Sequence, residues 1–167
     1  MDYNIFKRRQ NNLKSVLESK SLDGIFITNL TNIRYICGFT GSAASCLITP
    51  DGNYFLSDGR YIEQSKEQVK GFKCYLDMRS HLEQIKKEKL NKPGLQIAFE
   101  GQHVSYSLYR QMKNLFPGTE WVDTSMILED LASVKDDYEI ACIKTAVEVT
   151  DKVYEEILDM LCPGHTE

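Results

Sequence analysis

Apolar residues at helical spacing open the chain. They are Phe6, Leu13, Val16 and Leu17. This spacing predicts a helix with one buried face, which ends before Gly24. The next segment, 24–28, is apolar at nearly every position, a pattern typical of a strand buried on both faces. Residues 29–41 then read as a loop that contains a short helical piece over 32–37.

An antiparallel hairpin and a regular alternation of strands and helices follow. Strands are predicted over 44–49 and 54–57, joined by the turn sequence Pro50-Asp51-Gly52-Asn53. The later elements are a helix over 61–69, a strand over 72–76, a lysine-rich helix over 82–90, a strand over 95–99, a helix over 105–115 and a strand over 121–123. This alternation predicts an α/β domain with three layers (α/β/α), in which helices cover both faces of a mixed β-sheet.

The C-terminal part has a different pattern. Regular spacing is lost over 125–135, and then Asp136 and Glu139 form a capping box at the start of a helix. One apolar stripe continues along that helix through Ile140, Ile143, Val147, Thr150, Val153, Ile157 and Leu161. Seven turns correspond to a long C-terminal helix of about 35 Å. We therefore expect residues 1–130 to form a complete α/β domain and 131–167 to be a linker and a helix that packs on something outside the chain.

Composition narrows the class of protein. Of the 167 residues, 42% are hydrophobic and 26% are charged, which is typical of a globular domain. With 20 basic and 24 acidic residues the net charge is −4, which gives no reason to expect nucleic acid or an anionic membrane as a partner. The polar N-terminus, the lack of a long apolar run and five scattered cysteines predict a cytoplasmic location, with four of the cysteines as small core residues.

Few residues have the spacing of a known catalytic motif. His81, His103 and His165 are not at metal-ligand spacing, and the chain contains no phosphate-binding glycine loop and no nucleophile elbow. Glu100 follows a predicted strand and is a possible general base. A lone carboxylate at such a place is more often a helix cap or a surface group.

Two stretches carry a stronger signal. In 32–42, two glycines bracket Phe39 and a hydroxyl residue, which permits tight turns that present side chains to a ligand. The alternative is a loop that packs Tyr35 and Phe39 into the core. In the second stretch, Asp58 and Arg60 lie between a strand and a helix, where an ion pair that fixes the turn is the favoured interpretation.

These stretches resemble the N-terminal domain of the creatinase/prolidase family, and within it bacterial Xaa-Pro aminopeptidases and dipeptidases. The matching motifs are Asn32-x-x-Tyr35-x-x-Gly38-Phe39-x-Gly41-Ser42 and Asp58-Gly59-Arg60-Tyr61. The C-terminal part resembles the opening of the family's catalytic domain, through Val134-Lys135-x-x-x-Glu139-Ile140-x-x-Ile143-Lys144-x-Ala146 and Pro163-Gly164-x-Thr166-Glu167. One departure is Ala132-Ser133, where the family usually has an arginine shortly before the lysine.

The resemblance implies a two-domain metallopeptidase that hydrolyses the peptide bond preceding proline. Its "pita-bread" catalytic domain holds two divalent ions, commonly manganese, with ligands that would all lie beyond residue 167. It follows that residues 1–167 contain no catalytic residue and no metal ligand, that 131–167 begin a truncated catalytic domain, and that this chain alone is inactive.

The resemblance also implies a role for the N-terminal domain, which pairs two subunits and places a loop over the neighbouring active site. The positions matching that loop are Tyr35, Gly38, Phe39, Thr40 and Ser42. Asp58 and Arg60 would support it. The implied partners are the missing catalytic domain, a second copy in a homodimer, and short proline-containing peptides as substrates.

Two other functions fit the same motifs. One is a stand-alone peptide- or protein-binding module of the same fold. The C-terminal helix argues against this function, because a soluble monomer rarely exposes an apolar stripe like the one at Ile143, Val147, Val153 and Ile157. The other is a fragment of a creatine amidinohydrolase, which shares the two-domain plan and uses no metal. The residues 38–42 look more like those of the peptidases.

Overall fold

The computed structural model describes residues 3–76, 80–161 and 164. The strands are β1 (Gly24–Ile27), β2 (Ala44–Thr49), β3 (Gly52–Ser57), β4 (Lys73–Leu76), β5 (Gln96–Glu100) and β6 (Glu120–Thr124). The helices are α1 (Tyr3–Ser19), α2 (Leu30–Cys37), α3 (Ile62–Gln68), α4 (His81–Lys87), α5 (Tyr106–Leu115), α6 (Ile127–Ser133) and α7 (Asp137–Met160), with a 3₁₀ turn η1 (Gly59–Tyr61). Two compact units divide between Ala132 and Ser133.

The sheet of the first unit is mixed. Its strand order is β4-β3-β2-β1-β5-β6. The predicted hairpin is present, because β2 pairs antiparallel with β3 and Thr49 lies opposite Gly52. β1 is antiparallel to β2 on one side and parallel to β5 on the other. Within this six-stranded sheet β2 therefore runs opposite to the other five strands, and the carboxyl ends of β1 and β5 lie at the same edge.

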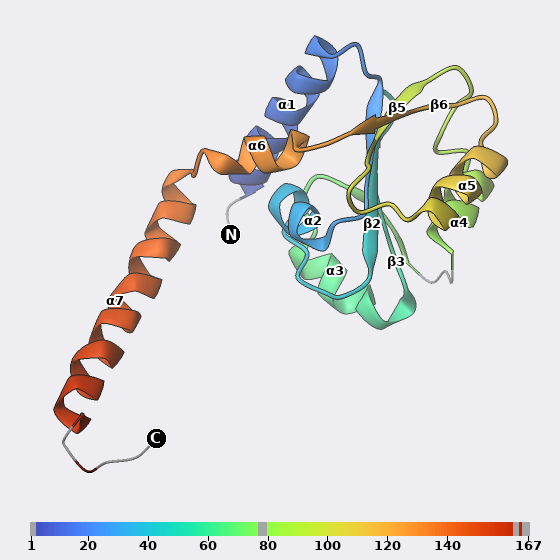
Figure 1. Cartoon of the computed structure of the whole chain (residues 1–167). Helices are drawn as coiled ribbons and strands as arrows, with labels where there is room; N and C mark the ends of the chain where they lie inside the picture. Colours follow the sequence, from blue (N-terminus) through green and yellow to red (C-terminus); the bar gives the residue numbers. More distant parts are fainter. Residues whose placement is uncertain (1–2, 77–79, 162–163, 165–167) are drawn as a thin grey trace. The chain divides into compact units, whose positions relative to one another are not determined.

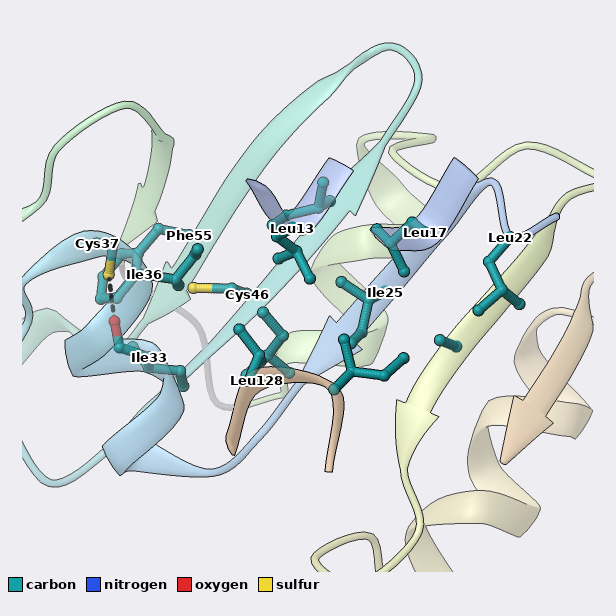
Figure 2. Packing of buried hydrophobic residues seen from close by; sticks show 14 of the residues in the cluster. Leu13, Leu17, Leu22, Ile25, Ile33, Ile36, Cys37, Cys46, Phe55 and Leu128 are labelled. Carbon is teal, nitrogen blue, oxygen red and sulfur yellow. Dashed lines mark hydrogen bonds between the residues drawn. The ribbon is translucent and has the colours of Figure 1, made fainter. Parts of the chain in front are cut away.

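Helices cover both faces of the sheet, which confirms the predicted three-layer α/β/α architecture. α1, α2, α3 and α6 lie on one side, and α4 and α5 on the other (Figure 1). On the first side, Leu13 and Leu17 of α1 and Ile33 and Ile36 of α2 pack with Ile25, Cys46, Phe55 and Leu128 (Figure 2). On the second side, Leu82, Ile85 and Met112 pack on Phe26, Leu47, Ile97 and Trp121. β1 is buried at all four of its positions, which confirms the two-sided burial that its apolar run predicts.

Two elements differ from their prediction. α6 forms over 127–133, where the sequence shows no regular spacing, because Ile127 and Leu128 are buried against the first core. The lysine-rich helix α4 ends at Lys87, three residues earlier than predicted. Leu90 remains buried although it lies beyond the helix, so its apolar character reflects packing and not helical periodicity.

The cysteines are less uniformly buried than expected. Cys37 and Cys46 lie in the first core, and burial raises the pKa of the Cys46 thiol well above its usual value. Cys74 is half-buried and Cys142 is exposed on α7. Cys37 and Cys46 are thus confirmed as core residues and Cys142 is not one, while Cys162 falls outside the described residues, so the number of four core cysteines stays a prediction.

The second unit consists mainly of α7. Asp136 accepts a hydrogen bond from the Glu139 amide at 3.0 Å, and the Glu139 carboxylate accepts one from the Asp136 amide at 3.0 Å, which confirms the capping box. Ile143, Val147 and Val153 along its stripe are about half exposed. The motif that begins at Pro163 lies mostly outside the described residues. No helix within the described part of the chain is long and apolar enough to cross a membrane.

Candidate functional site

The end of α2 sets the path of the motif loop. Asn29 caps the helix by accepting a hydrogen bond from the Thr31 amide at 2.9 Å. Gly38 ends it with φ of 88°, and its amide donates to the Arg34 carbonyl. A Cβ atom at Gly38 would contact the Phe6 ring and a backbone carbonyl of α3. The first glycine of the motif is therefore required by both its left-handed conformation and its close packing.

Phe39 anchors the loop in the core. Its side chain is 1% exposed. The ring packs edge-on against Phe55 at a centroid distance of 4.8 Å and against Tyr61 at 5.2 Å. The backbone of Gly41 passes so close to the Phe39 ring that a Cβ there would overlap it. The stretch can be interpreted either as a loop that presents side chains to a ligand or as one that packs into the core. Phe39 follows the second interpretation, because its ring is buried.

Thr40 and Ser42 are the exposed hydroxyl residues of the loop. The amide and hydroxyl of Thr40 donate to Gln68 Oε1 at 3.0 and 3.1 Å. The Ser42 hydroxyl lies 2.7 Å from the Tyr61 hydroxyl, and the Ser42 amide donates to the same oxygen at 3.2 Å. These hydrogen bonds lower the pKa of Tyr61. The loop thus presents two polar side chains on a backbone that α3 and Tyr61 hold in place.

Tyr35 connects α2 to neighbouring elements. The Arg9 guanidinium lies 4.3 Å from the centre of the Tyr35 ring, and Arg9 Nη1 donates to the Tyr35 carbonyl at 2.9 Å. The Tyr35 hydroxyl donates to the Leu131 carbonyl at 3.3 Å. Tyr35 is half-buried, so it joins α1, α2 and α6 with only part of its surface available to a partner.

Asp58 and Arg60 form the ion pair expected at the second stretch. Arg60 Nε and Nη2 donate to the two carboxylate oxygens at 2.9 and 2.8 Å, and the Arg60 amide donates to Asp58 Oδ1 at 3.0 Å. Bonding to Arg60 lowers the pKa of Asp58 from 3.8 to about 2, and the same bonds raise the pKa of Arg60. Both side chains lie at the surface, so their role is to hold the η1 turn that carries Tyr61.

Glu100 is the largest departure from the sequence interpretation. It is the last residue of β5 and is only 8% exposed. Its Oε2 accepts from the amides of Thr28 and Asn29 at 2.6 and 2.8 Å, and its Oε1 accepts from Asn32 Nδ2 at 2.7 Å. The interpretation of Glu100 as a surface group is therefore wrong, and its bond to the amide of Asn29, the N-cap residue of α2, agrees better with the helix-cap interpretation. Buried backbone donors at the end of β1 require an acceptor, and Glu100 is that acceptor.

A second carboxylate completes this network, which we call the Glu100 cluster (Glu100, Asn32 and Glu129). Glu129 on α6 accepts from the same Asn32 nitrogen at 2.7 Å. Sequence reasoning missed Glu129 because its partner is 97 positions away. The cavity beside the cluster measures about 10 Å³, which is room for a single water. The cluster therefore joins α2, β5 and α6 and offers no space to a substrate.

A serine and a histidine meet on the other side of the sheet. Ser45 Oγ lies 2.9 Å from His81 Nδ1 at the start of α4. Burial lowers the pKa of His81, and the nearby Asp58 charge acts in the opposite direction. The Asp58 oxygens bond to Arg60, so they do not orient the imidazole as the acid of a catalytic triad would. The contact with His81 gives the buried Ser45 hydroxyl a hydrogen-bond partner, and this structural role accounts for the pair.

The metal ions that the sequence resemblance implies do not fit this chain's own residues. Within the described ranges, no three histidine, cysteine, aspartate or glutamate side chains come together as ligands. Glu100 and Glu129 share one partner, Asn32, and an oxygen of each already accepts a hydrogen bond from it.

Fold and loops together define an α/β domain that is built to present a fixed surface loop. The sequence profile of the Creatinase/Prolidase N-terminal domain matches residues 9–134. The chain belongs to this family. This confirms the family resemblance that the two motif stretches indicate.

Three relatives show which proteins this chain is similar to. The uncharacterized peptidase YqhT of Bacillus subtilis (strain 168) is 32% identical over 156 residues, which cover 93% of this chain and 44% of YqhT. An Xaa-Pro dipeptidase from Bacillus anthracis has a TM-score of 0.86 and 31% identity, over 97% of this chain and 45% of that one. The N-terminal domain of the cytoplasmic peptidase PepQ from Mycobacterium tuberculosis H37Rv has a TM-score of 0.65 and 26% identity, over 74% of this chain and 98% of that one. This chain thus spans less than half the length of the first two relatives.

Proposed function

We propose that this chain is the non-catalytic N-terminal domain of a metal-dependent Xaa-Pro aminopeptidase or dipeptidase, which hydrolyses the peptide bond preceding proline. The observation that carries the proposal is the similarity to the Bacillus anthracis dipeptidase over 97% of this chain. YqhT, a peptidase by name, supports the same assignment. In this proposal the reaction takes place in a catalytic domain that follows residue 167.

The metal ions belong to that further domain. Two divalent ions, commonly manganese in this family, would supply the activated water and stabilise the oxyanion there. The protein acts in the cytoplasm as a homodimer, and its substrates are short proline-containing peptides. The helix α7 supports the existence of a further domain, because its apolar stripe is about half exposed within its own unit.

The role of the N-terminal domain in this proposal is to pair subunits and to restrict access to the neighbouring active site. Thr40 and Ser42 are the exposed residues through which the loop contacts substrate. Phe39 and Gly38 fix the loop backbone, and Tyr35 holds α2 beneath it. The Asp58–Arg60 ion pair supports the turn that carries Tyr61, to which Ser42 is bonded.

Exchange of both hydroxyls tests this role in the longer protein. The double variant Thr40→Ala, Ser42→Ala should change KM for tripeptides and longer substrates by about threefold to tenfold, since one or two hydrogen bonds of 0.5–1.5 kcal/mol are lost. Values for dipeptides should change less, because short substrates extend less far from the scissile bond. The measurement is steady-state kinetics over substrates of increasing length.

Ser15→Ala is the matched control for this experiment, since Ser15 is exposed on α1, away from the loop. It should leave all constants unchanged. If the double variant behaves like Ser15→Ala with every substrate length, the loop has no part in substrate access.

A further inference from the structure

An open pocket unrelated to the motif loop lies beside the ends of β5 and β6. Its volume is about 350 Å³. Four aromatic side chains and one carboxylate line it: Phe99, Tyr106, Tyr109, Trp121 and Asp123. Ligand pockets in proteins begin at about 300 Å³, so a pocket of this size suits a small ligand.

The aromatic side chains that line the pocket differ in exposure. Trp121 and Phe99 are each 6% exposed, so they form the fixed floor. The Phe99 and Tyr109 rings lie 5.3 Å apart at an interplanar angle of 32°. Tyr106, at the first position of α5, is 76% exposed. An aromatic ring this exposed next to a pocket is available to close over a ligand.

Asp123 gives the pocket its charge. Its side chain is exposed, and no hydrogen bond or ion pair joins its carboxylate to any residue in the described ranges. The carboxylate lies against Gly101, where a Cβ atom would overlap with it. Glycine at 101 therefore admits the carboxylate to this position. The unpaired negative charge and the aromatic faces attract the same kind of ligand, which is a cation.

The hydrogen-bond acceptors that line the pocket determine which kind of ammonium group it favours. A primary ammonium has three N–H donors and is strongly hydrated, so it needs several acceptors to replace its water. The side chains lining this pocket offer one carboxylate as a charged acceptor, two tyrosine hydroxyls that both donate and accept, and the indole N–H of Trp121, which only donates. An ammonium that carries methyl groups has few or no N–H donors to satisfy, and its methyl groups pack on aromatic rings.

We propose that this pocket binds a small organic cation with a quaternary or N-methylated ammonium head. The head packs on the faces of Trp121, Tyr106 and Tyr109, with its positive charge toward the Asp123 carboxylate. The site is independent of the peptidase assignment, because its lining residues lie outside the motif loop.

Choline chloride is a direct probe of this site. Trp121 is the only tryptophan in the chain, so its fluorescence and its indole N–H resonance report on the pocket alone. We expect a saturable change with a Kd of about 1–10 mM, typical of a cation held by ring faces and one exposed charge. The neutral isostere 3,3-dimethylbutan-1-ol should bind about tenfold more weakly, and sodium chloride at equal ionic strength should produce no saturable change.

Variants separate charge from packing. Asp123→Asn should weaken choline binding about tenfold and Tyr106→Ala about threefold, through loss of the ionic partner and of one ring face. Both side chains are exposed, so the core remains intact. Glu120→Gln on the same strand removes one exposed charge outside the pocket and should leave Kd unchanged. Absence of saturable binding, equal binding of the neutral isostere, or an unchanged Kd for Asp123→Asn would each overturn the proposal.

Discussion

Phe39→Ala should lower the free energy of unfolding of the first unit by about 3–5 kcal/mol, the usual cost of truncating a buried phenylalanine. The side chain is 1% exposed, and it makes edge-on contacts with Phe55 and Tyr61 that are lost with the ring. Urea unfolding followed by Trp121 fluorescence measures the change, because Trp121 lies in the first unit.

Two further variants serve as comparisons for the stability loss of Phe39→Ala. Phe39→Leu retains most of the buried volume and should cost less than the alanine change. Tyr106→Ala removes an aromatic ring that is 76% exposed and should change stability by no more than about 0.5 kcal/mol. A loss below about 1 kcal/mol for Phe39→Ala would mean that the ring does not anchor the loop. In the longer protein, the same variant should also alter KM, since the backbone that carries Thr40 and Ser42 loses its anchor.

Glu100→Ala is the second large effect, with an expected loss of about 3 kcal/mol. Removal of the carboxylate leaves the amides of Thr28 and Asn29 without their acceptor at the end of β1. Each unsatisfied buried donor costs about 1–3 kcal/mol, while the Asn32 side chain keeps a partner in Glu129. The same urea experiment measures the change.

Glu129→Ala is the matched control for the Glu100 cluster. Glu129 accepts one hydrogen bond, from an Asn32 amide that also donates to Glu100, so its removal leaves that nitrogen with a partner. We expect a loss of about 1 kcal/mol or less. Equal losses for the two variants would show that Glu100 is not the principal acceptor.

Local sequence predicted most of the elements because local physics determines them. The turn residues at 50–53 set the hairpin, and Asp136 and Glu139 set the start of α7, since each signal acts within four positions of the chain. The buried strands follow from short apolar runs that only a two-sided core can accommodate. The Asp58–Arg60 pair was equally predictable, because its two residues are two positions apart.

What the sequence could not predict depends on contacts between distant residues. α6 forms because Ile127 and Leu128 pack into the first core, and no local periodicity in the sequence predicts this helix. The sequence leaves Glu100 open as a general base, a helix cap or a surface group, and only the pairing of β1 with β5 makes it the acceptor for two backbone amides. Gln10 is similar: it is buried on α1 because its amide donates to the carbonyls of Ile36 and Lys70, 26 and 60 positions away. The pocket at Asp123 likewise requires β5 and β6 to lie side by side.

The most direct measurement for the central proposal is peptide hydrolysis with added metal. The chain of residues 1–167 and the longer protein that contains it are incubated separately with Mn²⁺ and an Xaa-Pro dipeptide, and the release of the free N-terminal amino acid is quantified. The proposal predicts release by the longer protein that a chelator abolishes, and release by residues 1–167 no faster than with Mn²⁺ alone. Chelator-sensitive turnover by residues 1–167, or no turnover by the longer protein on any Xaa-Pro peptide, would contradict it.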